Sequence, residues 1–450
     1  MKKPEPVSVI GAGLAGCEAA WQLARRGVPV LLHEMKPEEH SAAHHLHTLA
    51  ELVCSNSLRS SRLVNAVGLL KEEMRCLGSL ILACADRTAI PAGGALAVDR
   101  ELFSREVTGC IDSEPMITLI HGRVDQIPAE GIVIAATGPL TDGALADSIR
   151  SRLGIETLHF YDAAAPLLTA ESIDQNVAFW QSRYDRGGAD YLNCPLNQAE
   201  YESFWTELVQ AQRADLPGHD AEIVFEGCMP IETMARRGRD TIRFGPLKPV
   251  GLTDPRTGRE PYACVQLRQD NRAASLFNMV GFQTRLRFSE QQRVFRLIPG
   301  LESAEFARFG VMHRNTFLPS PGLLAPDFSL RKEPRLYFAG QITGVEGYVE
   351  SSASGLLAGR QAAAQAWGID RTIRLAAVPS ARTMIGALAR YVSDERINDF
   401  QPMNANYGLI EPLPGRFRQK NDRLQAQAER SLTEIAGLTD LDGGERETKK

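Results

Sequence analysis

The chain has 450 residues, more than one ordinary domain, so two or three folded units are expected. Apolar residues make up 44% and charged residues 23%, which is typical of a globular protein and excludes a disordered one. The net charge of -5 leaves an RNA partner open, because nucleic-acid binding requires a basic face rather than a basic chain.

No segment approaches the ~20 apolar residues of a membrane-spanning helix, and the first apolar run ends in glycines, unlike a signal peptide. We therefore expect a cytoplasmic protein without a membrane partner. The eight cysteines include no C-x-x-C pair, so neither a zinc site nor a disulfide framework is expected. His44, His45 and His47 lack acidic or sulfur ligands at a matching spacing, so no metal site is predicted.

The first predicted unit is a strand, a glycine-rich turn, a helix and a second strand. Residues 7–10 and 28–33 predict the strands, and residues 17–27 have the apolar spacing of a helix. The turn between them consists of Gly11, Ala12, Gly13, Leu14, Ala15 and Gly16. This order is the fingerprint of a Rossmann-type dinucleotide site, in which the backbone and the helix N-terminus approach a pyrophosphate. Glu34 ends the second strand, where a carboxylate accepts hydrogen bonds from a ribose.

Two later segments favour FAD over NAD. Residues 131–138 predict a buried strand ending in a small-residue turn, and residues 336–341 predict another strand before a small-residue helix. The bland alternative for the second segment is a βα unit that binds nothing. In flavoproteins such a returning unit faces the flavin, so we assign Gly340, Gln341 and Tyr348 to the cofactor. Glu346 and Glu350 rank second, because carboxylates at a helix start also serve as ordinary caps.

These segments predict an α/β protein whose Rossmann-type FAD-binding domain is split by an inserted α+β domain. The expected divisions are 1–170 for the first part, 171–305 for the insert on the RNA side, and 306–450 for the second part with C-terminal helices. Within the insert we expect strands at 221–228, 241–245 and 262–268 and a helix near 198–212. The last ~25 residues are polar and are expected to fray or form a surface helix.

Long motifs across nearly the whole chain carry a family resemblance. They include AELVCSNSLRS (50–60), NAVGLLKEEMR (65–75), PAGGALAVDR (91–100), FEGCMPIE (225–232), NMVGFQT (278–284), GVMHRNTF (310–317), FAGQITGVEGYVESSASG (338–355) and QPMNANYG (401–408). With these motifs the chain resembles the folate- and FAD-dependent tRNA (uracil-5-)-methyltransferase family, TrmFO. The related MnmG/GidA flavoproteins share the cofactor fold but not this set of motifs. The loop SAAHHLHTLAELV departs from the family pattern before Cys54.

The resemblance implies methylation of carbon-5 of the T-loop uridine in the T-arm of tRNA. Methylenetetrahydrofolate would donate the carbon, reduced FAD would carry it, and NADH or NADPH would be the reductant. Carbon-5 of uracil is a weak nucleophile until a thiolate adds to carbon-6, so the site needs a reactive cysteine and a base. Cys228 matches the family's nucleophile, and Cys54 matches the cysteine to which the family assigns proton abstraction beside the flavin. No obligate protein partner is implied.

The remaining cysteines are expected to be structural or to pack in the interior. They are Cys17, Cys76, Cys84, Cys110, Cys194 and Cys264. Basic side chains within 236–248, 268–296 (Arg268 among them) and 416–423 are candidates for RNA contact, although each is by default a solvated face. His313 is a candidate for folate or RNA contact or a structural histidine.

Three other functions stay open from the sequence alone. They are the same chemistry on ribosomal RNA, a small-molecule FAD oxidoreductase, and an RNA chaperone that keeps FAD for structure. The sequence also leaves open the oligomeric state, the choice between NADH and NADPH, and the residues that contact folate.

Overall fold

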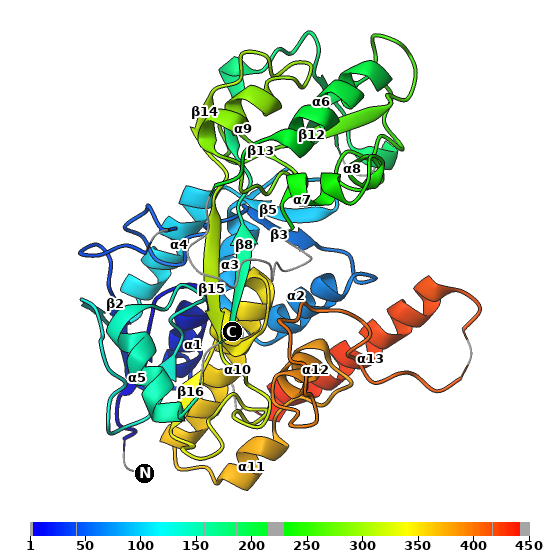
Figure 1. The fold of residues 1–450 in the computed structure, drawn as a ribbon. Coiled ribbons are helices and arrows are strands. Elements are labelled where there is room, and N and C mark those ends of the chain that lie inside the picture. Colours follow the sequence, from blue (N-terminus) through cyan, green and yellow to red (C-terminus); the bar gives the residue numbers. More distant parts are fainter. Residues whose placement is uncertain are drawn as a thin grey trace, which may run out of the picture.

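The computed structural model describes residues 3–41, 43–155, 158–185, 188–214, 229–415 and 417–441. Figure 1 shows two bodies stacked on each other. Both ends of the chain build the lower body, and the middle of the chain builds the upper one.

The lower body is organised around a parallel sheet of five strands in the order β16-β7-β1-β2-β6. Its strands are β1 Val7–Ile10, β2 Val30–Glu34, β6 Ile117–His121, β7 Val133–Ala135 and β16 Leu336–Phe338. Strands β7 and β16, which precede and follow the upper body in sequence, pair in parallel, with Leu336 opposite Val133. This doubly wound α/β sheet confirms the predicted Rossmann-type fold and the strands that were expected on either side of the glycine turn.

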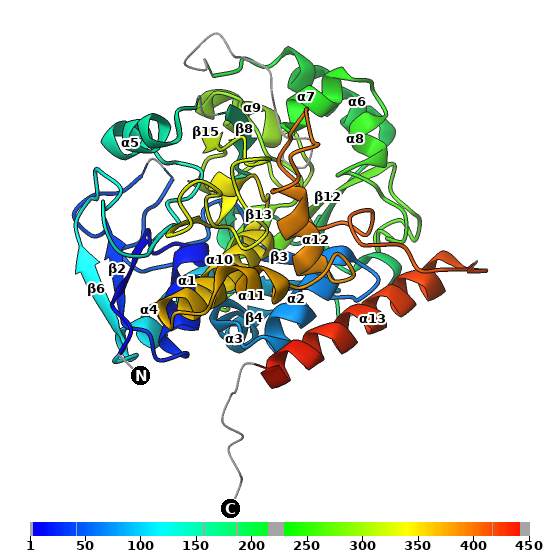
Figure 2. The same ribbon diagram turned by 90° about the horizontal axis from the view of Figure 1, so that it is seen from below.

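Helices and a small sheet surround the parallel strands. The helices are α1 Leu14–Ala24, α2 Ala66–Cys76, α3 Leu80–Arg87, α4 Arg100–Asp112, α5 Gly143–Leu153, α10 Tyr348–Ala366, α11 Arg371–Ala376, α12 Met384–Tyr391 and α13 Lys420–Leu441. The small sheet has the order β3-β5-β4, with β3 Ser57–Ser60, β4 Ala89–Ile90 and β5 Ala95–Val98. The polar C-terminal segment forms α13, which packs along α2 (Figure 2), so the surface-helix alternative holds there.

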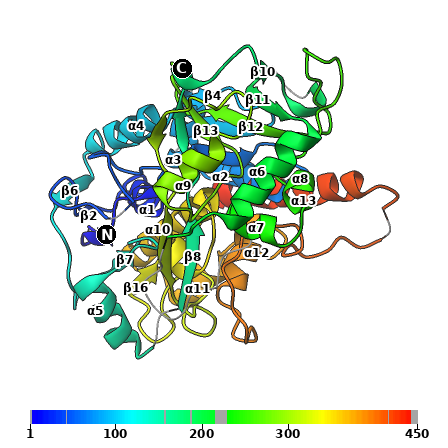
Figure 3. The ribbon, with the colours of Figure 1, turned by 45° about the horizontal axis from the view of Figure 1, so that its top comes forward.

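The upper body is an antiparallel sheet of six strands in the order β10-β11-β12-β13-β9-β14. The strands are β9 Leu167–Thr169, β10 Phe179–Trp180, β11 Tyr191–Leu196, β12 Ala263–Gln269, β13 Leu276–Met279 and β14 Phe306–Arg308. Its helices, seen in Figure 3, are α6 Gln198–Gln210, α7 Ile231–Arg236, α8 Thr241–Phe244 and α9 Phe288–Phe295. Short 3-10 turns occur at Ala170–Ser172, Arg183–Asp185 and, in the lower body, Gln341–Thr343. A separate hydrophobic core joins this sheet to its helices through Phe204, Val265 and Phe295.

Two of the four elements expected in the insert are present. The helix near 198–212 is α6, and the strand at 262–268 is β12. The strand expected at 241–245 is wrong, because these residues form the single-turn helix α8, whose Ile242 is buried in the core. The strand expected at 221–228 lies outside the described residues. The domain boundaries at 171 and 305 remain predictions.

The chain passes between the two bodies twice, and the two passages pair with each other. Strand β8 Leu158–Ala163 leads upward and β15 Met312–Phe317 leads back, joined as an antiparallel ribbon with Ala163 opposite Met312. The ribbon is visible between the bodies in Figure 1. Because exit and return are adjacent, the insertion leaves the parallel sheet undisturbed.

A buried carboxylate on α2 attaches the C-terminal helices. Glu73 accepts hydrogen bonds from the backbone N–H groups of Met384 (2.7 Å) and Ile385 (2.8 Å) at the start of α12, and from the hydroxyl of Ser431 on α13. Burial raises the pKa of Glu73 from its ordinary 4.5 to about 7, and these hydrogen bonds oppose the shift.

Replacing Glu73 with Gln is therefore expected to change how stability depends on pH. Because the folded-state pKa is raised, the native protein binds the proton more tightly, so this contribution is fully present below pH 4.5 and is lost as pH rises through 7. Relative to the native protein, Glu73→Gln should gain up to about 3 kcal/mol in unfolding free energy between pH 4.5 and 8. Denaturant unfolding at several pH values measures this difference. The neighbouring Glu72→Gln, at a half-exposed position where the carboxylate pairs with Arg75, should show no such trend.

Candidate functional site

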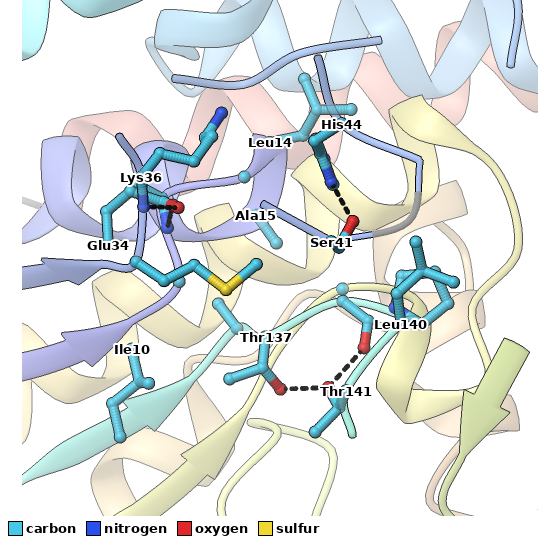
Figure 4. Close-up of a pocket in the computed structure, with 18 of the residues that line it drawn as sticks. Ile10, Leu14, Ala15, Glu34, Lys36, Ser41, His44, Thr137, Leu140 and Thr141 are labelled. Carbon is cyan, nitrogen blue, oxygen red and sulfur yellow. Dashed lines mark hydrogen bonds between the residues drawn. The ribbon is translucent and has the colours of Figure 1, made fainter. Parts of the chain in front are cut away.

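A first cavity lies at the carboxyl ends of β1, β2 and β7, where the glycine turn enters α1 (Figure 4). Gly11 has φ +95°, and a Cβ there would lie 2.6 Å from the carbonyl oxygen of Ala136. A Cβ on Gly16 would lie 1.7 Å from the carbonyl oxygen of Gly11, so only glycine allows α1 to start this close to β1. A Cβ on Gly13 would meet nothing within 4 Å, because this residue faces the open cavity.

The carboxylate of Glu34 closes one end of this cavity. Its Oε2 accepts a hydrogen bond from the N–H of Ala12 (2.9 Å), and its Oε1 accepts one from the N–H of Lys36 (3.1 Å). The acid at the end of β2 is thereby held beside the turn, as a ribose-binding carboxylate would be. Figure 4 shows Glu34 and Lys36 on the same side of the cavity.

Further polar side chains line the first cavity. The hydroxyl of Ser41 lies 2.6 Å from Nδ1 of His44, and the hydroxyl of Thr141 donates to that of Thr137 (2.6 Å). Burial lowers the pKa of His44, which favours a neutral ring. These four side chains add polar, uncharged groups to the lining of the cavity (Figure 4).

The cavity fits an elongated dinucleotide because it has hydrogen-bond donors free at both ends. The N-terminus of α1 has no side-chain cap, so its first N–H groups point to the cavity without a partner from a capping residue. The N-terminus of α10 also lacks a side-chain cap, and the buried hydroxyl of Ser351 in its first turn has no hydrogen-bond partner. Gly340, Gln341 and Tyr348, which the sequence assigned to the cofactor, line the same cavity.

A second cavity of about 420 Å³ adjoins the first, and the volume is within the range of small-molecule sites. Both cavities are lined by Val53, Pro139, Leu140, Gln341 and Tyr348. The second cavity reaches the β8–β15 ribbon and the central strands β12 and β13 of the upper sheet, and Cys54 lies in its wall. A molecule in the second cavity would therefore sit against the α10 end of a molecule in the first.

The hydroxyl of Tyr348 joins the two cavities. It accepts hydrogen bonds from the backbone N–H groups of Cys54 (2.8 Å) and Ser55 (3.2 Å). Burial raises the pKa of Tyr348, so the phenol stays neutral. The side chain at the start of α10 thereby fixes the backbone that carries the Cys54 thiol.

The same loop is also tied to the upper body. The buried amide of Asn56 donates to the carbonyl oxygens of Val98 (3.0 Å) and Gln269 (3.1 Å). Arg268 donates to Oδ1 of Asn56 (3.0 Å) and to the hydroxyl of Ser55 (2.7 Å). Arg268 is only 7% exposed, so the default interpretation of it as part of a solvated face is wrong, and its contact with RNA stays a prediction. Through Ser55 and Asn56 it holds the loop that begins at Cys54, the cysteine loop, against β12.

The two cysteines assigned to chemistry differ in what the structure describes. Cys54 is half-buried, and its Sγ lies 3.8 Å from the carbonyl oxygen of Ala163 on the ribbon. Cys228 lies outside the described residues. The side chain of His313 also lies outside the described part, although its strand β15 is described.

The remaining cysteines follow the expected packing in all but one clear case. Cys17, Cys84, Cys194 and Cys264 are buried, and Cys110 is half-buried. Cys76 is exposed at the end of α2, so its assignment to the interior is wrong. The buried side of α2 near this point is occupied by Glu73 and Met74.

The two carboxylates expected near the flavin have different surroundings. Glu346 lines the second cavity and accepts two hydrogen bonds from the amide of Gln341 (2.9 and 3.0 Å). Glu350 is buried beneath the cavity wall, where it pairs with Arg59 and accepts the N–H of Ala405 (2.8 Å). Glu350 thus ties the start of α10 to Arg59 and to the segment at Ala405, whereas no side chain caps the helix, so the capping alternative is not what the structure has.

Neither a metal cluster nor a membrane span is found within the described ranges. No group of three or more His, Cys, Asp or Glu side chains there could hold a metal ion. No described helix is both long enough and apolar enough to cross a bilayer.

The sheet, the turn and the first cavity define a dinucleotide-binding protein of the Rossmann class, and comparisons narrow the class. Residues 6–370 match the family described as "Glucose inhibited division protein A". Two solved structures of GidA from Aquifex aeolicus share the fold, with TM-scores of 0.67 and 0.70 at 18% and 17% identity. They cover 98% and 99% of this chain, which in turn spans 76% and 77% of theirs.

Two curated relatives are much more similar. Both are named methylenetetrahydrofolate–tRNA-(uracil-5-)-methyltransferase TrmFO, and they come from Acetivibrio thermocellus (60% identical) and Geobacter sulfurreducens (58% identical). Each alignment covers 95% of this chain, and 97% and 98% of the two relatives. The chain belongs to the TrmFO family of methyltransferase enzymes, which confirms the resemblance seen in its motifs.

Removing the Tyr348 hydroxyl should loosen the Cys54 loop without disturbing the fold. In Tyr348→Phe, the N–H groups of Cys54 and Ser55 lose their acceptor, which costs about 1–3 kcal/mol. Hydrogen exchange should accelerate at these two amides, and the unfolding midpoint should fall. Tyr391→Phe, which removes a hydroxyl on the surface, is the matched control. Unchanged exchange at Cys54 would show that Tyr348 does not hold the loop.

Proposed function

We propose that this chain binds FAD in the first cavity and uses methylenetetrahydrofolate to methylate carbon-5 of a uridine in tRNA. The observation that carries the proposal is the adjoining pair of cavities, with Cys54 in the second and Tyr348 shared between them. The names of the relatives from Acetivibrio thermocellus and Geobacter sulfurreducens support the donor and the acceptor. When bound, FAD supplies the redox chemistry and the folate supplies the carbon.

The residues proposed to hold FAD are spread over both halves of the lower body. The turn at Gly11–Gly16 and the start of α1 receive the pyrophosphate, and Glu34 receives the ribose. Gly340, Gln341 and Tyr348 contact the flavin end. The unpaired hydroxyl of Ser351 and the free N–H groups at the start of α10 offer donors to that end as well.

Cys228 is the proposed nucleophile, and its thiolate would add to carbon-6 of the uracil so that carbon-5 can attack an electrophilic carbon. Its position along the chain supports this role. Ile231, three residues later, donates its N–H to the carbonyl oxygen of Gln283 (2.8 Å), and Gln283 lines the second cavity. The described chain three residues after Cys228 is thus bonded to the wall of the second cavity.

Cys54 is the proposed base that removes the proton from carbon-5. A base must act on an atom within hydrogen-bond reach of it, and Cys54 lines the cavity in a loop that is held through its own N–H and through the side chain of Ser55. Arg268 on one side and Tyr348 on the other restrict the movement of the loop, which keeps the thiol positioned.

RNA binding is proposed on the upper body, with the T-loop uridine as acceptor and NADH or NADPH as reductant in a cytoplasmic enzyme. The surface around α8 combines charge with an aromatic ring, since the guanidinium of Arg243 lies 5.0 Å from the ring of Phe244, which is 66% exposed. Exposed aromatic and basic groups suit unstacked bases and phosphates. The acceptor base must leave its stack to reach the second cavity.

The direct test supplies labelled methylenetetrahydrofolate, NAD(P)H and unmodified tRNA to the flavin-loaded protein and looks for labelled 5-methyluridine by mass spectrometry. Cys228→Ala should lower the rate about 10³-fold or more, as loss of a nucleophile does, and Cys54→Ala about 10²-fold. Cys76→Ala, exposed and lining neither cavity, is the control. Label in ribosomal RNA alone would change the acceptor, and label in neither RNA would overturn the proposal.

The assignment of the first cavity to FAD has a separate test. Glu34→Ala removes the carboxylate at the ribose end, and the purified variant should retain several-fold less flavin than the native protein. Absorbance of the bound flavin relative to protein measures the retention. Glu38→Ala changes an exposed carboxylate four residues further and should leave flavin content intact. Equal flavin in all three proteins would place the cofactor elsewhere.

A further inference from the structure

Among the carboxamide side chains that line the second cavity, three have no hydrogen-bond partner in the part of the chain that the structure describes. They are Asn278, Gln283 and Asn315. Among the described residues, none of the three side chains makes a hydrogen bond, and Nδ2 of Asn278 is buried and unpaired. Asn278 and Asn315 are each only 3% exposed. Burying amides without partners costs free energy, so the arrangement favours a ligand that pairs with them.

The three amides come from elements that meet at one end of the upper sheet. Asn278 lies in β13 opposite Leu167 of β9, and Gln283 follows in the segment that bonds back to the ribbon through Thr284 and Ala164. Asn315 lies in β15 of the ribbon itself. Apolar groups complete the wall, chiefly Val280 and the alanines 163–165. The three amides therefore supply polar groups to the cavity, and its apolar faces suit a flat ring.

The chemistry of these groups restricts the ligand. A carboxamide offers N–H donors and a carbonyl acceptor side by side, so it pairs in two places with a ring that presents N–H next to C=O. A phosphate or carboxylate accepts only and would call for cations. The guanidinium groups at this cavity are already engaged, Arg268 by the cysteine loop and Arg59 by Glu350 and Asn404.

We propose that Asn278, Gln283 and Asn315 form a recognition site for the lactam edge of a pyrimidine ring, the N–H and C=O unit shared by uracil and by the pterin of a folate. This inference rests on the proposed function, because it names the part of the substrate or donor that the second cavity reads. The amides position the ring, and the Cys54 thiol lies in the wall of the same cavity.

The experiment uses the flavin-loaded protein and isosteric replacements, Asn278→Asp, Gln283→Glu and Asn315→Asp, which exchange a donor for an acceptor. Gln210→Glu, at an exposed position of α6 in the same body, is the matched control. One arm measures tetrahydrofolate binding by calorimetry. The other measures methylation of an RNA stem-loop carrying uridine against the same RNA carrying 3-methyluridine, in which the lactam N–H is blocked.

Each hydrogen-bonded pair between an amide and the ring that a variant loses should lower the affinity for tetrahydrofolate or the rate of RNA methylation about tenfold. If the pterin is the ligand, the variants lose affinity for tetrahydrofolate. If uracil is the ligand, the native enzyme rejects 3-methyluridine, and the variants methylate the normal RNA more slowly with reduced discrimination. Should an acidic replacement prevent folding, Asn278→Leu and Asn315→Leu remove the same donors without adding charge.

Changes below twofold in both arms, in folded variants whose native counterpart methylates RNA, would overturn the inference and leave the proposed function standing. A native protein that methylates neither RNA would instead overturn the proposed function. In that case the calorimetric arm still decides whether the amides bind a pterin, because it requires no methyl transfer.

Discussion

The two halves of the lower body are held together by a backbone contact between α1 and α10. A Cβ on Gly355 would lie 2.2 Å from the carbonyl oxygen of Ala15, and one on Gly359 would lie 2.6 Å from that of Ala19. The helices come from opposite ends of the chain, and no pair of elements in the described chain is in more extensive contact. Any side chain at these glycines would push α10 outward, together with the cavity wall at Tyr348. The split domain therefore depends on glycines far from the glycine turn itself.

Buried ionisable groups extend this contact to the cysteine loop and the C-terminal helices. Glu18 on α1 accepts the N–H of Ile81 (3.0 Å) at the start of α3, as Glu73 does for α12. Lys71, also on α2, donates to the carbonyl oxygens of Leu58 (2.9 Å) and Arg59 (3.0 Å), and burial lowers the pKa of Lys71 to about 7. Such groups pay a desolvation penalty, but each fixes a segment remote in sequence.

How much the sequence could predict depends on whether the cause of each feature is local. The strands at β1 and β2, the glycine turn and the acid at position 34 follow from spacing within one short stretch, and the structure has them as expected. Helix α8 was taken for a strand because its four residues have no helical period to read. Contacts fix it instead, since Ile242 is buried and the guanidinium of Arg243 lies 4.0 Å from the ring of Tyr262.

The candidate site likewise combines features that local sequence predicts with features that depend on contacts between distant segments. The sequence indicated Cys54 and Tyr348 separately. Only the fold shows that the hydroxyl of Tyr348 holds the backbone of Cys54, which lies 294 positions away in the chain. Arg268 looked like a surface cation because its partner Asn56 is 212 positions away. The unpaired amides at Asn278 and Asn315 belong to different motifs that no spacing rule would combine.

The position of Tyr348 has a consequence for how the two cavities work together. It lines both cavities, begins α10, and bonds to the backbone of Cys54, a residue that lines the second cavity. A ligand in the first cavity that shifts this side chain must also shift the Cys54 loop, because the two share a hydrogen bond of 2.8 Å. Arg268 holds the other side of that loop to β12, so its freedom is small. The α10 end of the first cavity and the backbone of Cys54 beside the second are thus linked through one phenol, so a change at either cavity that moves this side chain is felt at the other.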